Sequence, residues 1–281
     1  MTLPRLLIGS LLALGLTYLF VMAALWFSQR SLIYPAPQGE QVVPPGFEEV
    51  TLRTADGLDL AAAWHAGDGN RPVLVFFHGN GDTWAGGNSA TRMLQQAGYA
   101  VLLPEYRGYG RNPGKPDEAG FYADGRAAIG WLREQGIGPD RIVLIGNSMG
   151  SGTATQLASE GAARALILVS PYASLPDVVA SRLWWLPARW LVRDQFDNAA
   201  KLGAIRTPVL LLQGSADTVV PPAQVVRLAK TNPRARLIMF AGQDHSLAYT
   251  AEAQQAELDW LAENALPAAH PTSQRQAPAG T

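Results

Sequence analysis

The sequence predicts an α/β fold in which one central, mostly parallel sheet carries helices on both faces. The main observation is a series of short, nearly continuous apolar runs, the pattern of strands that are buried on both faces. Segments compatible with helices lie between these runs, and this alternation is typical of parallel sheets. The 281 residues include 48% hydrophobic and only 16% charged residues, which is enough apolar material for one sizeable core. We therefore expect one main folded domain, over residues 48–264.

An apolar segment without any charged residue, 6–27, stands near the N-terminus. As a helix it would be about 33 Å long, which is enough to cross a bilayer. We expect residues 1–28 to be a transmembrane anchor. The alternative is a cleaved signal peptide, since small residues occur around Ala24, and the protein would then be secreted or periplasmic. The α-amino charge and short N-terminal tail favour a cytoplasmic N-terminus and an extracytoplasmic domain. The proline-rich residues 29–47 are expected to form a tether.

The folded domain begins with two strand-like segments joined by Ala55-Asp56-Gly57, which is a hairpin signal. Further apolar runs follow, and the last expected helix precedes a Pro- and Ala-rich stretch, 265–281, that predicts a disordered tail. The expected strands lie within 48–54, 58–66, 72–79, 99–106, 141–148, 164–171, 208–215 and 235–242, and the main expected helices within 117–135, 149–161, 222–231 and 250–264.

Composition excludes several kinds of chemistry. The chain has no cysteine, so disulfides, thiolate catalysis and cysteine-bound metals are excluded. Its histidines show no metal-ligand spacing, and we expect neither a metal nor another cofactor. A net charge of -1 provides no long-range attraction to polyanions, so nucleic acid is not an expected partner.

The segment from Leu144 to Gly152 places one serine between two glycines, where an apolar run passes into very small residues. A sharp strand-to-helix turn of this kind, a nucleophile elbow, needs glycine two positions before and after the serine because larger side chains would collide. Gly146 and Gly150 meet this need around Ser148. The alternative is an ordinary strand end whose serine caps the helix. We predict the elbow, with Ser148 as the nucleophile.

A serine hydroxyl is a weak nucleophile near neutral pH, so the elbow requires a base and a group that orients the base. In enzymes built on such an elbow, the order along the chain is serine, acid, histidine. Two histidines follow Ser148, and His270 lies in the expected tail. We therefore predict His245, directly after the last strand, as the base; otherwise it is a surface loop residue.

The acid should follow the strand that precedes this histidine. Asp217 lies there, in a loop before a helix that starts with proline, and we predict it as the acid. Its alternative role is a helix cap or an Asx turn. Asp244 competes because it adjoins His245, although neighbouring side chains rarely face each other as a base and its orienting acid must. Asp194 and Asp197 are further candidates.

A tetrahedral intermediate also needs hydrogen-bond donors for its oxyanion. The residue after the nucleophile supplies one, the backbone N–H of Met149 at a helix N-terminus. The second should come from the loop after an earlier strand, where glycines surround Asn80, and we predict the Asn80 backbone N–H with Gly81 as the neighbouring possibility. His78 is expected to be a hydrogen-bonded structural residue of this loop.

These segments together resemble the membrane-anchored, bud-emergence-like branch of the α/β hydrolases, over roughly residues 26–264. The resemblance implies serine hydrolase activity on esters or thioesters, a single-pass anchor, and Ser148, Asp217 and His245 as the triad. It also implies that lipids or acylated proteins are possible substrates. The segments that carry it are HGNGD (78–82), the stretch from Pro104 to Leu132, GNSMG (146–150), GSADTVVPP (214–222), GQDHS (242–246) and RSLIYPAP (30–37).

Residues 172–202 interrupt the strand series where such hydrolases insert a short cap. Tryptophans and leucines cluster in this segment. One interpretation is a small buried helix pair. The other is an apolar acyl pocket, walled by Trp184 and Trp185, or an entrance that faces the membrane, because tryptophan favours bilayer interfaces.

The sequence thus predicts a serine hydrolase that cleaves ester or thioester bonds of acyl or lipid-like substrates through an acyl-Ser148 intermediate. A serine peptidase that uses the same triad is an alternative. A membrane-tethered binding protein without catalytic activity is another, although the predicted triad has all its members.

Overall fold

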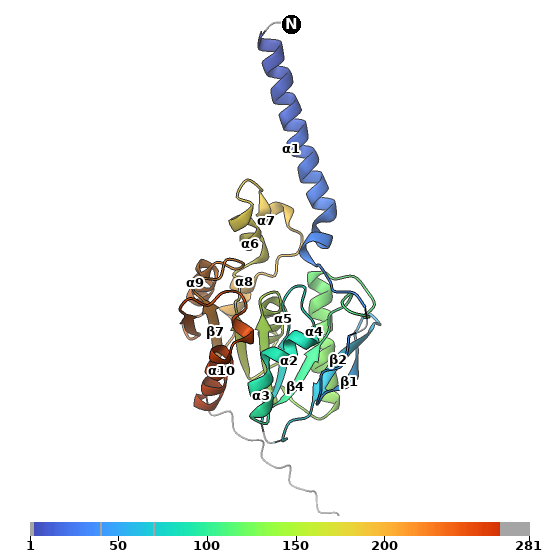
Figure 1. The fold of residues 1–281 in the computed structure, drawn as a ribbon, viewed down its shortest axis with the longest axis vertical. Coiled ribbons are helices and arrows are strands. Elements are labelled where there is room, and N and C mark those ends of the chain that lie inside the picture. Colours follow the sequence, from blue (N-terminus) through green and yellow to red (C-terminus); the bar gives the residue numbers. More distant parts are fainter. Residues whose placement is uncertain (1–2, 40, 70, 265–281) are drawn as a thin grey trace, which may run out of the picture.

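The computed structural model of the chain describes residues 3–39, 41–69 and 71–264 (Figure 1). Its centre is an eight-stranded sheet with the order β1-β2-β4-β3-β5-β6-β7-β8. Each predicted strand-like run contains one strand, which confirms the predicted sheet. The predicted tail, 265–281, lies outside the described residues. The strands are β1 (Glu48–Arg53), β2 (Asp59–His65), β3 (Val73–Phe77), β4 (Ala100–Pro104), β5 (Ile142–Asn147), β6 (Ala165–Val169), β7 (Val209–Gly214) and β8 (Arg236–Phe240).

The sheet is mostly parallel. β2 pairs antiparallel with both β1 and β4, whereas every neighbouring pair from β4 across to β8 is parallel. The carboxyl ends of β3, β5, β7 and β8 therefore lie along one edge of the sheet. Loops that follow these strands meet at that edge, where open α/β sheets bind their ligands.

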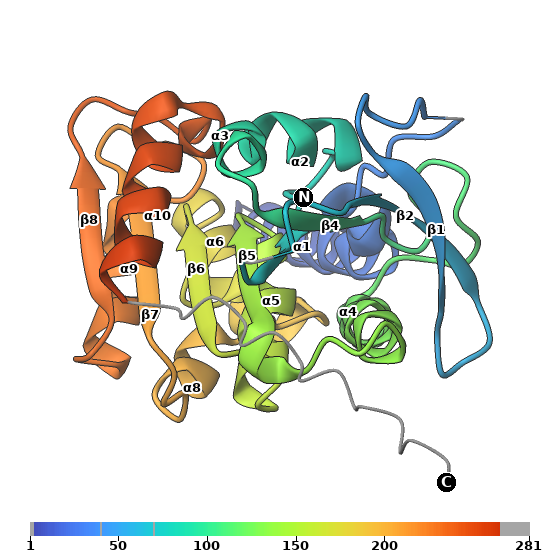
Figure 2. The ribbon, with the colours of Figure 1, turned by 90° about the horizontal axis from the view of Figure 1, so that it is seen from below.

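Helices cover both faces of the sheet (Figure 2). Helices α4, α5, α8 and α9 contribute to the apolar cluster on one face, and α2, α3 and α10 to the cluster on the other. The four main predicted helices correspond to α4, α5, α9 and α10. The helices of this domain are α2 (Trp84–Ala90), α3 (Arg92–Gln96), α4 (Glu118–Glu134), α5 (Gly150–Ser159), α8 (Asn198–Leu202), α9 (Pro222–Thr231) and α10 (Ala251–Glu263), with 3₁₀ turns at Pro139–Arg141 and Leu247–Tyr249.

The central strand β5 shows why these apolar runs become strands buried on both sides. Ile142 and Leu144 belong to the apolar cluster on one face, while Val143 and Ile145 belong to the cluster on the other. Successive side chains of a strand point to opposite faces, so a continuous apolar run fills both layers. Full burial of each such side chain stabilises the fold by about 1.5–3 kcal/mol.

A long helix, α1 (Leu3–Ile33), projects from the domain (Figure 1). Its segment Leu7–Ile33 has a mean hydropathy of 2.1 and is long and apolar enough to cross a membrane, a property that signal sequences share. The helix continues through residues 29–33, which the sequence had placed in the tether. The reason is tertiary: Arg30 lies 3.1 Å from Asp117 and 3.3 Å from Asp194, and these ion pairs hold the last turn of α1 on the domain.

The predicted cap segment, 172–202, holds α6 (Leu175–Arg182) and α7 (Ala188–Leu191) as well as α8. Helices α6 and α7 lie at the same end of the molecule as α1 (Figure 1). The side chain of Gln29 joins the two parts, because it donates to the carbonyl of Leu191 at 3.2 Å and accepts from the Arg193 N–H at 2.8 Å. The cap, as we call residues 172–202 below, therefore contacts the C-terminal half of α1.

Candidate active site

Ser148 stands in a strained turn between β5 and α5. Its φ is 50°, a left-handed value that is uncommon outside glycine. A Cβ at Gly146 would lie 2.6 Å from the Gly150 carbonyl oxygen, and one at Gly150 only 2.0 Å from the Phe77 carbonyl oxygen. Both glycines are thus required by close backbone approach, as the elbow interpretation expects.

Ser148, His245 and Asp217 lie together at the carboxyl edge of the sheet. His245 Nε2 is 2.9 Å from Ser148 Oγ, and His245 Nδ1 is 2.8 Å from Asp217 Oδ2. The three side chains come from the loops after β5, β8 and β7. Residues that are separated by up to 97 positions thus form one continuous hydrogen-bonded chain.

The Asp217 carboxylate is buried and held from several sides. Its Oδ1 accepts from the N–H groups of Val219 and Val220, each at 2.8 Å, and its Oδ2 also accepts from Gln213 Nε2 at 2.9 Å. Burial tends to raise the pKa of this carboxyl, but the hydrogen bonds from His245 and from the two backbone groups outweigh it, so the pKa is lowered. Asp217 is therefore an anion beside the His245 ring at neutral pH.

The competing carboxylates have other partners. Asp244 Oδ1 accepts from the Ser246 N–H, which turns this side chain toward its own loop. Asp194 accepts from the Tyr34 hydroxyl at 2.9 Å and pairs with Arg30. Asp197 caps α8 through the Ala200 N–H. The structure brings none of these three to His245, and it brings Asp217 there instead.

The loop after β3 carries the predicted second oxyanion donor. Asn80 lines the same cavity as Ser148. Its side chain donates to the Ile33 carbonyl at 2.5 Å and accepts from the Tyr109 hydroxyl at 3.0 Å. The backbone of Gly81, the neighbouring possibility, faces the Tyr109 hydroxyl and partly offsets the rise in the Tyr109 pKa that burial causes.

The buried side chain of His78 holds this loop through hydrogen bonds. Its Nε2 lies 2.8 Å from Glu105 Oε1 and its Nδ1 2.9 Å from the Gly79 carbonyl oxygen. Burial tends to lower the His78 pKa, but the Glu105 carboxylate outweighs burial and raises it. Glu105 also accepts from the Trp84 N–H, so the pair ties the loop to the start of α2. This position agrees with the structural role that the sequence predicts for His78.

A cavity of about 410 Å³ opens at Ser148. The sequence did not single out several residues of its wall, including Asn147, Val219 and Ser246. Tyr249 is another, and its hydroxyl donates to Asp82 at 2.6 Å across the rim. The only available signal was proximity in sequence, since Asp82 ends the HGNGD segment and Tyr249 follows His245 by four residues. We call this space the Ser148 cavity.

The predicted acyl-pocket residues lie elsewhere. Neither Trp184 nor Trp185 lines the Ser148 cavity, and 84% of the Trp184 side chain is exposed. Both stand in the outward turn between α6 and α7, which carries them away from the sheet edge. The prediction that they wall a substrate pocket is therefore wrong, as is the alternative of a buried helix pair.

Among residues 3–39, 41–69 and 71–264, no group of three or more His, Asp or Glu side chains is arranged to hold a metal ion. At the Ser148 cavity a hydroxyl and an imidazole stand in line with the buried Asp217 carboxylate, a geometry through which a proton can pass from the hydroxyl to the imidazole.

Comparison with known proteins agrees with this architecture. The α/β hydrolase fold family matches residues 72–200, and a family described as TAP-like protein matches residues 179–273. An uncharacterized protein of Mycobacterium tuberculosis is 35% identical over 254 residues, 87% of this chain and 88% of its own length. Protein bem46 of Schizosaccharomyces pombe is 31% identical and is covered over 77% of its length by 78% of this chain. The chain belongs to the α/β hydrolases, in the branch of bem46.

Two further similarities concern this α/β hydrolase. The lysophosphatidylserine lipase ABHD12 of Danio rerio is 31% identical over 172 residues, which are 54% of this chain and 45% of the lipase. The Pyrococcus furiosus esterase Pf2001 superposes with a TM-score of 0.64 over 82% of this chain and 96% of its own, at 22% identity. The latter shows a shared fold. Membership of the α/β hydrolases supports hydrolase activity.

Proposed function

We propose that this α/β hydrolase is a serine hydrolase that cleaves carboxylic ester or thioester bonds through an acyl-Ser148 intermediate. The observation that carries the proposal is the hydrogen-bonded chain from Ser148 Oγ through the His245 ring to Asp217, with distances of 2.9 and 2.8 Å. A serine, a base and an acid in this geometry activate the hydroxyl as a nucleophile.

In the first half of the reaction, His245 Nε2 takes the hydroxyl proton while Ser148 Oγ attacks the acyl carbon. The Asp217 carboxylate holds the Nδ1–H tautomer and stabilises the imidazolium that forms. The backbone N–H groups of Asn80 and Met149 are the proposed donors to the oxyanion, the second of them at the N-terminus of α5. His245 then gives its proton to the leaving alcohol or thiol.

The second half repeats these steps with water. His245 Nε2 takes a proton from a water molecule, and the resulting hydroxide attacks the acyl-Ser148 carbonyl. Collapse of the second tetrahedral intermediate returns the proton to Ser148 Oγ and releases the carboxylic acid. The proposed roles require Asp217 to be ionised, and its lowered pKa satisfies this at neutral pH.

The proposed substrate class is an acyl ester or thioester with a lipid-like chain, either a lipid or an acylated protein. A relative named as a lysophosphatidylserine lipase supports the lipid case. A peptidase that uses the same three residues is the alternative reaction, and a membrane-tethered binding protein is the alternative without catalysis.

We also propose that α1 is an uncleaved single-pass anchor and that residues 48–264 form the catalytic domain outside the cytoplasm. The last turns of α1 support this, because Gln29, Arg30 and Ile33 are hydrogen-bonded to the cap or to the domain. The membrane fraction should resist carbonate extraction, and its N-terminal peptide should be detected by mass spectrometry. A mature N-terminus near Ala24 would instead establish a secreted enzyme.

The activity is tested with the full chain in detergent micelles. A fluorophosphonate probe should label wild-type protein at Ser148, as located by mass spectrometry, and p-nitrophenyl butyrate should be hydrolysed. Peptide p-nitroanilides serve as the peptidase control. Labelling without ester turnover but with amide turnover would favour a peptidase, and neither labelling nor turnover would favour the binding protein.

A further inference from the structure

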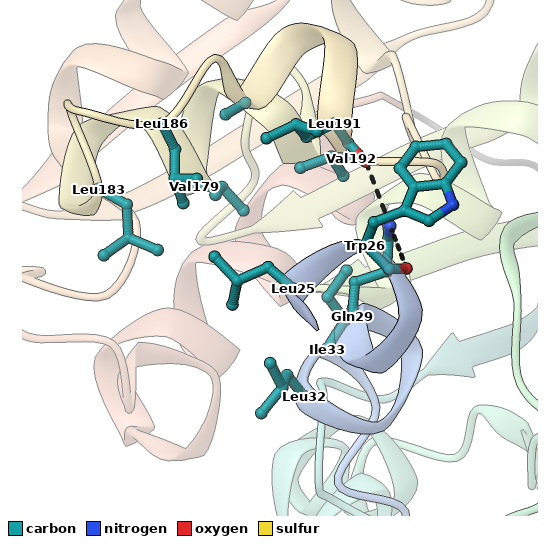
Figure 3. A pocket seen from close by; sticks show the side chains of 11 residues that line it. Leu25, Trp26, Gln29, Leu32, Ile33, Val179, Leu183, Leu186, Leu191 and Val192 are labelled. Carbon is teal, nitrogen blue, oxygen red and sulfur yellow. Dashed lines mark hydrogen bonds between the residues drawn. The ribbon is translucent and has the colours of Figure 1, made fainter. Parts of the chain in front are cut away.

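A second cavity, of about 230 Å³, lies between α1 and the cap (Figure 3). Leu25, Leu32 and Ile33 of α1 face it from one side. Val179 and Leu183 face it from the other side, together with further leucines of the cap. We call it the α1–cap cavity. None of the residues that line it also lines the Ser148 cavity.

The wall chemistry of the α1–cap cavity fits an apolar occupant. The polar side chain in this wall is Gln29. Its Nε2 donates to the carbonyls of Trp26 and Leu191, and its Oε1 accepts from the Arg193 N–H. The amide is therefore already satisfied by the protein. A cavity with such a wall has little to hold water and is suited to a hydrocarbon.

The cap reaches far along α1. The Tyr18 hydroxyl donates to the Trp185 carbonyl at 3.3 Å, and the two rings lie 6.5 Å apart. The helix between Leu7 and Tyr18 is about 17 Å long, much shorter than the roughly 30 Å hydrocarbon core of a bilayer. If α1 spans the membrane from Leu7, the bilayer extends past Tyr18 toward the domain, and the tip of the cap beside Tyr18 enters the membrane surface.

The tip of the cap has the surface that such a position requires. Residues 183–193 contain no Asp or Glu. Trp184 and Trp190 expose 84% and 87% of their surface, whereas Trp84 and Trp260 of the folded domain are buried. Arg189 is paired with Asp177, and Arg193 lies over the Trp26 ring at 5.6 Å. Exposed tryptophan with arginine is typical of segments at a membrane interface.

Two hydrogen bonds link the surroundings of the α1–cap cavity to those of the Ser148 cavity. Ile33, in the wall of the first, accepts through its carbonyl from Asn80, in the wall of the second. On the cap side, Arg182, the last residue of α6 and the neighbour of Leu183, donates to the Thr218 carbonyl at 2.7 Å. Thr218 stands between Asp217 and Val219, so both α1 and the cap are bonded to segments that carry residues of the proposed active site.

We propose that the α1–cap cavity binds the acyl chain of a membrane lipid whose ester bond is presented to Ser148. The proposal rests on the proposed function and specifies its substrate: a lipid ester whose chain passes from one leaflet into a space walled by the enzyme's own anchor helix. The exposed cap tip places the mouth of this space at the depth of the lipid chains. A soluble, short-chain ester would reach Ser148 without using it.

The test fills the cavity from both walls in the full-length chain. Val179→Trp narrows it from the cap and Leu25→Trp narrows it from α1. Matched controls are Ser181→Trp and Ala24→Trp, exposed positions on the same two helices that lie outside the cavity wall. Each protein is assayed in liposomes of phosphatidylcholine and phosphatidylglycerol, with p-nitrophenyl acetate and p-nitrophenyl laurate as substrates.

We expect both cavity variants to lower kcat/KM for the laurate ester at least tenfold while the acetate ester changes less than twofold. Each methylene buried in the cavity raises the binding constant roughly fourfold. A tenfold loss in kcat/KM therefore corresponds to about two methylenes that no longer fit into the cavity. The two controls should match wild type on both esters. Acetate turnover and fluorophosphonate labelling of Ser148 show that each variant is folded.

Other results would overturn the proposal. Equal losses on both esters would mean that the cavity supports the fold only, and no loss on laurate would mean that the chain binds elsewhere. If wild type cleaves acetate but not laurate, the acyl-chain site fails while the proposed hydrolase stands. If wild type cleaves neither ester and Ser148 is not labelled, the proposed function itself fails.

Discussion

The Ser148 cavity and the α1–cap cavity differ in almost every physical respect. The Ser148 cavity is lined by polar groups that are bonded to one another, and its central residue has a strained backbone with φ of 50°. The α1–cap cavity is lined mainly by leucines, isoleucine and valines of α1 and the cap. The difference separates two tasks. Chemistry requires exact positions of a few polar atoms, whereas binding of a hydrocarbon requires only apolar surface of the right size.

The largest effect should come from the nucleophile. Ser148→Ala should lower kcat/KM by about 10⁵-fold or more on acetate and laurate esters alike, as in other serine triads. Steady-state assays of both esters measure this, and circular dichroism checks the fold. Ser159→Ala, at the exposed far end of α5, is the matched control. An unequal loss on the two esters would break the separation between chemistry and chain binding.

The next effect concerns the acid. Asp217→Asn should lower kcat roughly 10⁴-fold, because an amide no longer holds the His245 ring in the required tautomer. Asp244→Asn is the control and should retain activity within a few-fold, since Asp244 bonds its own loop. A large loss in Asp244→Asn together with a small one in Asp217→Asn would show that the observed hydrogen-bonded chain is not the catalytic one.

The residue that joins the two cavities should have an intermediate effect. Asn80→Ala keeps the backbone N–H but removes the side-chain bonds to Ile33 and Tyr109. A misplaced oxyanion donor costs up to about 10²-fold, so we expect a loss of tenfold to a hundredfold in kcat on both esters. A change confined to the KM of the laurate ester would instead assign this side chain to chain binding.

The depth of the cap tip in the membrane tests the role of the α1–cap cavity, and the substitution used to measure it should have little effect on activity. The chain has no cysteine, so Trp190→Cys supplies a single thiol for a nitroxide label. In liposomes the label should be relaxed more by oxygen than by a water-soluble nickel complex. Glu134→Cys, at the far exposed end of α4, should show the reverse. Water-like accessibility at position 190 would place the cap tip outside the bilayer.

Glu257 is a buried carboxyl that lines neither cavity, so its titration should change the stability of the fold and leave the activity unchanged. Burial raises the pKa of Glu257 to about 8, so the folded protein binds this proton more tightly than the unfolded chain. Stability should therefore fall as pH rises from about 4.5 to 8. Glu257→Gln should remove this fall and raise Tm at pH 8 by roughly 3 °C or more, with unchanged ester turnover. Differential scanning fluorimetry across this pH range measures it, and an unchanged pH dependence would contradict it.

Much of the fold could be predicted because it depends on local patterns. Strands β3 to β8 are short apolar runs, and the glycines at 146 and 150 indicate the close backbone approach of the elbow. The order of Ser148, Asp217 and His245 was enough to nominate three residues, and the structure brings them within hydrogen-bonding distance. Their catalytic roles remain predictions. Helix α2 escaped detection because a segment rich in Gly, Ala, Ser and Asn has no apolar period, and α3 because its five residues are too few to show one.

The sequence by itself therefore determined the sheet, the strand-to-helix turn at Ser148 and the presence of an apolar N-terminal helix, since each is recorded in a run of neighbouring residues. Only the tertiary structure decided which carboxylate meets His245, that Trp184 and Trp185 face outward, and that α1 and the cap enclose an apolar space. The walls of that space come from Leu25 and from Val179, which are more than 150 positions apart in the chain. The apolar side chains of a helix can pack against any apolar surface, so the sequence does not specify which surfaces meet and only the tertiary packing does.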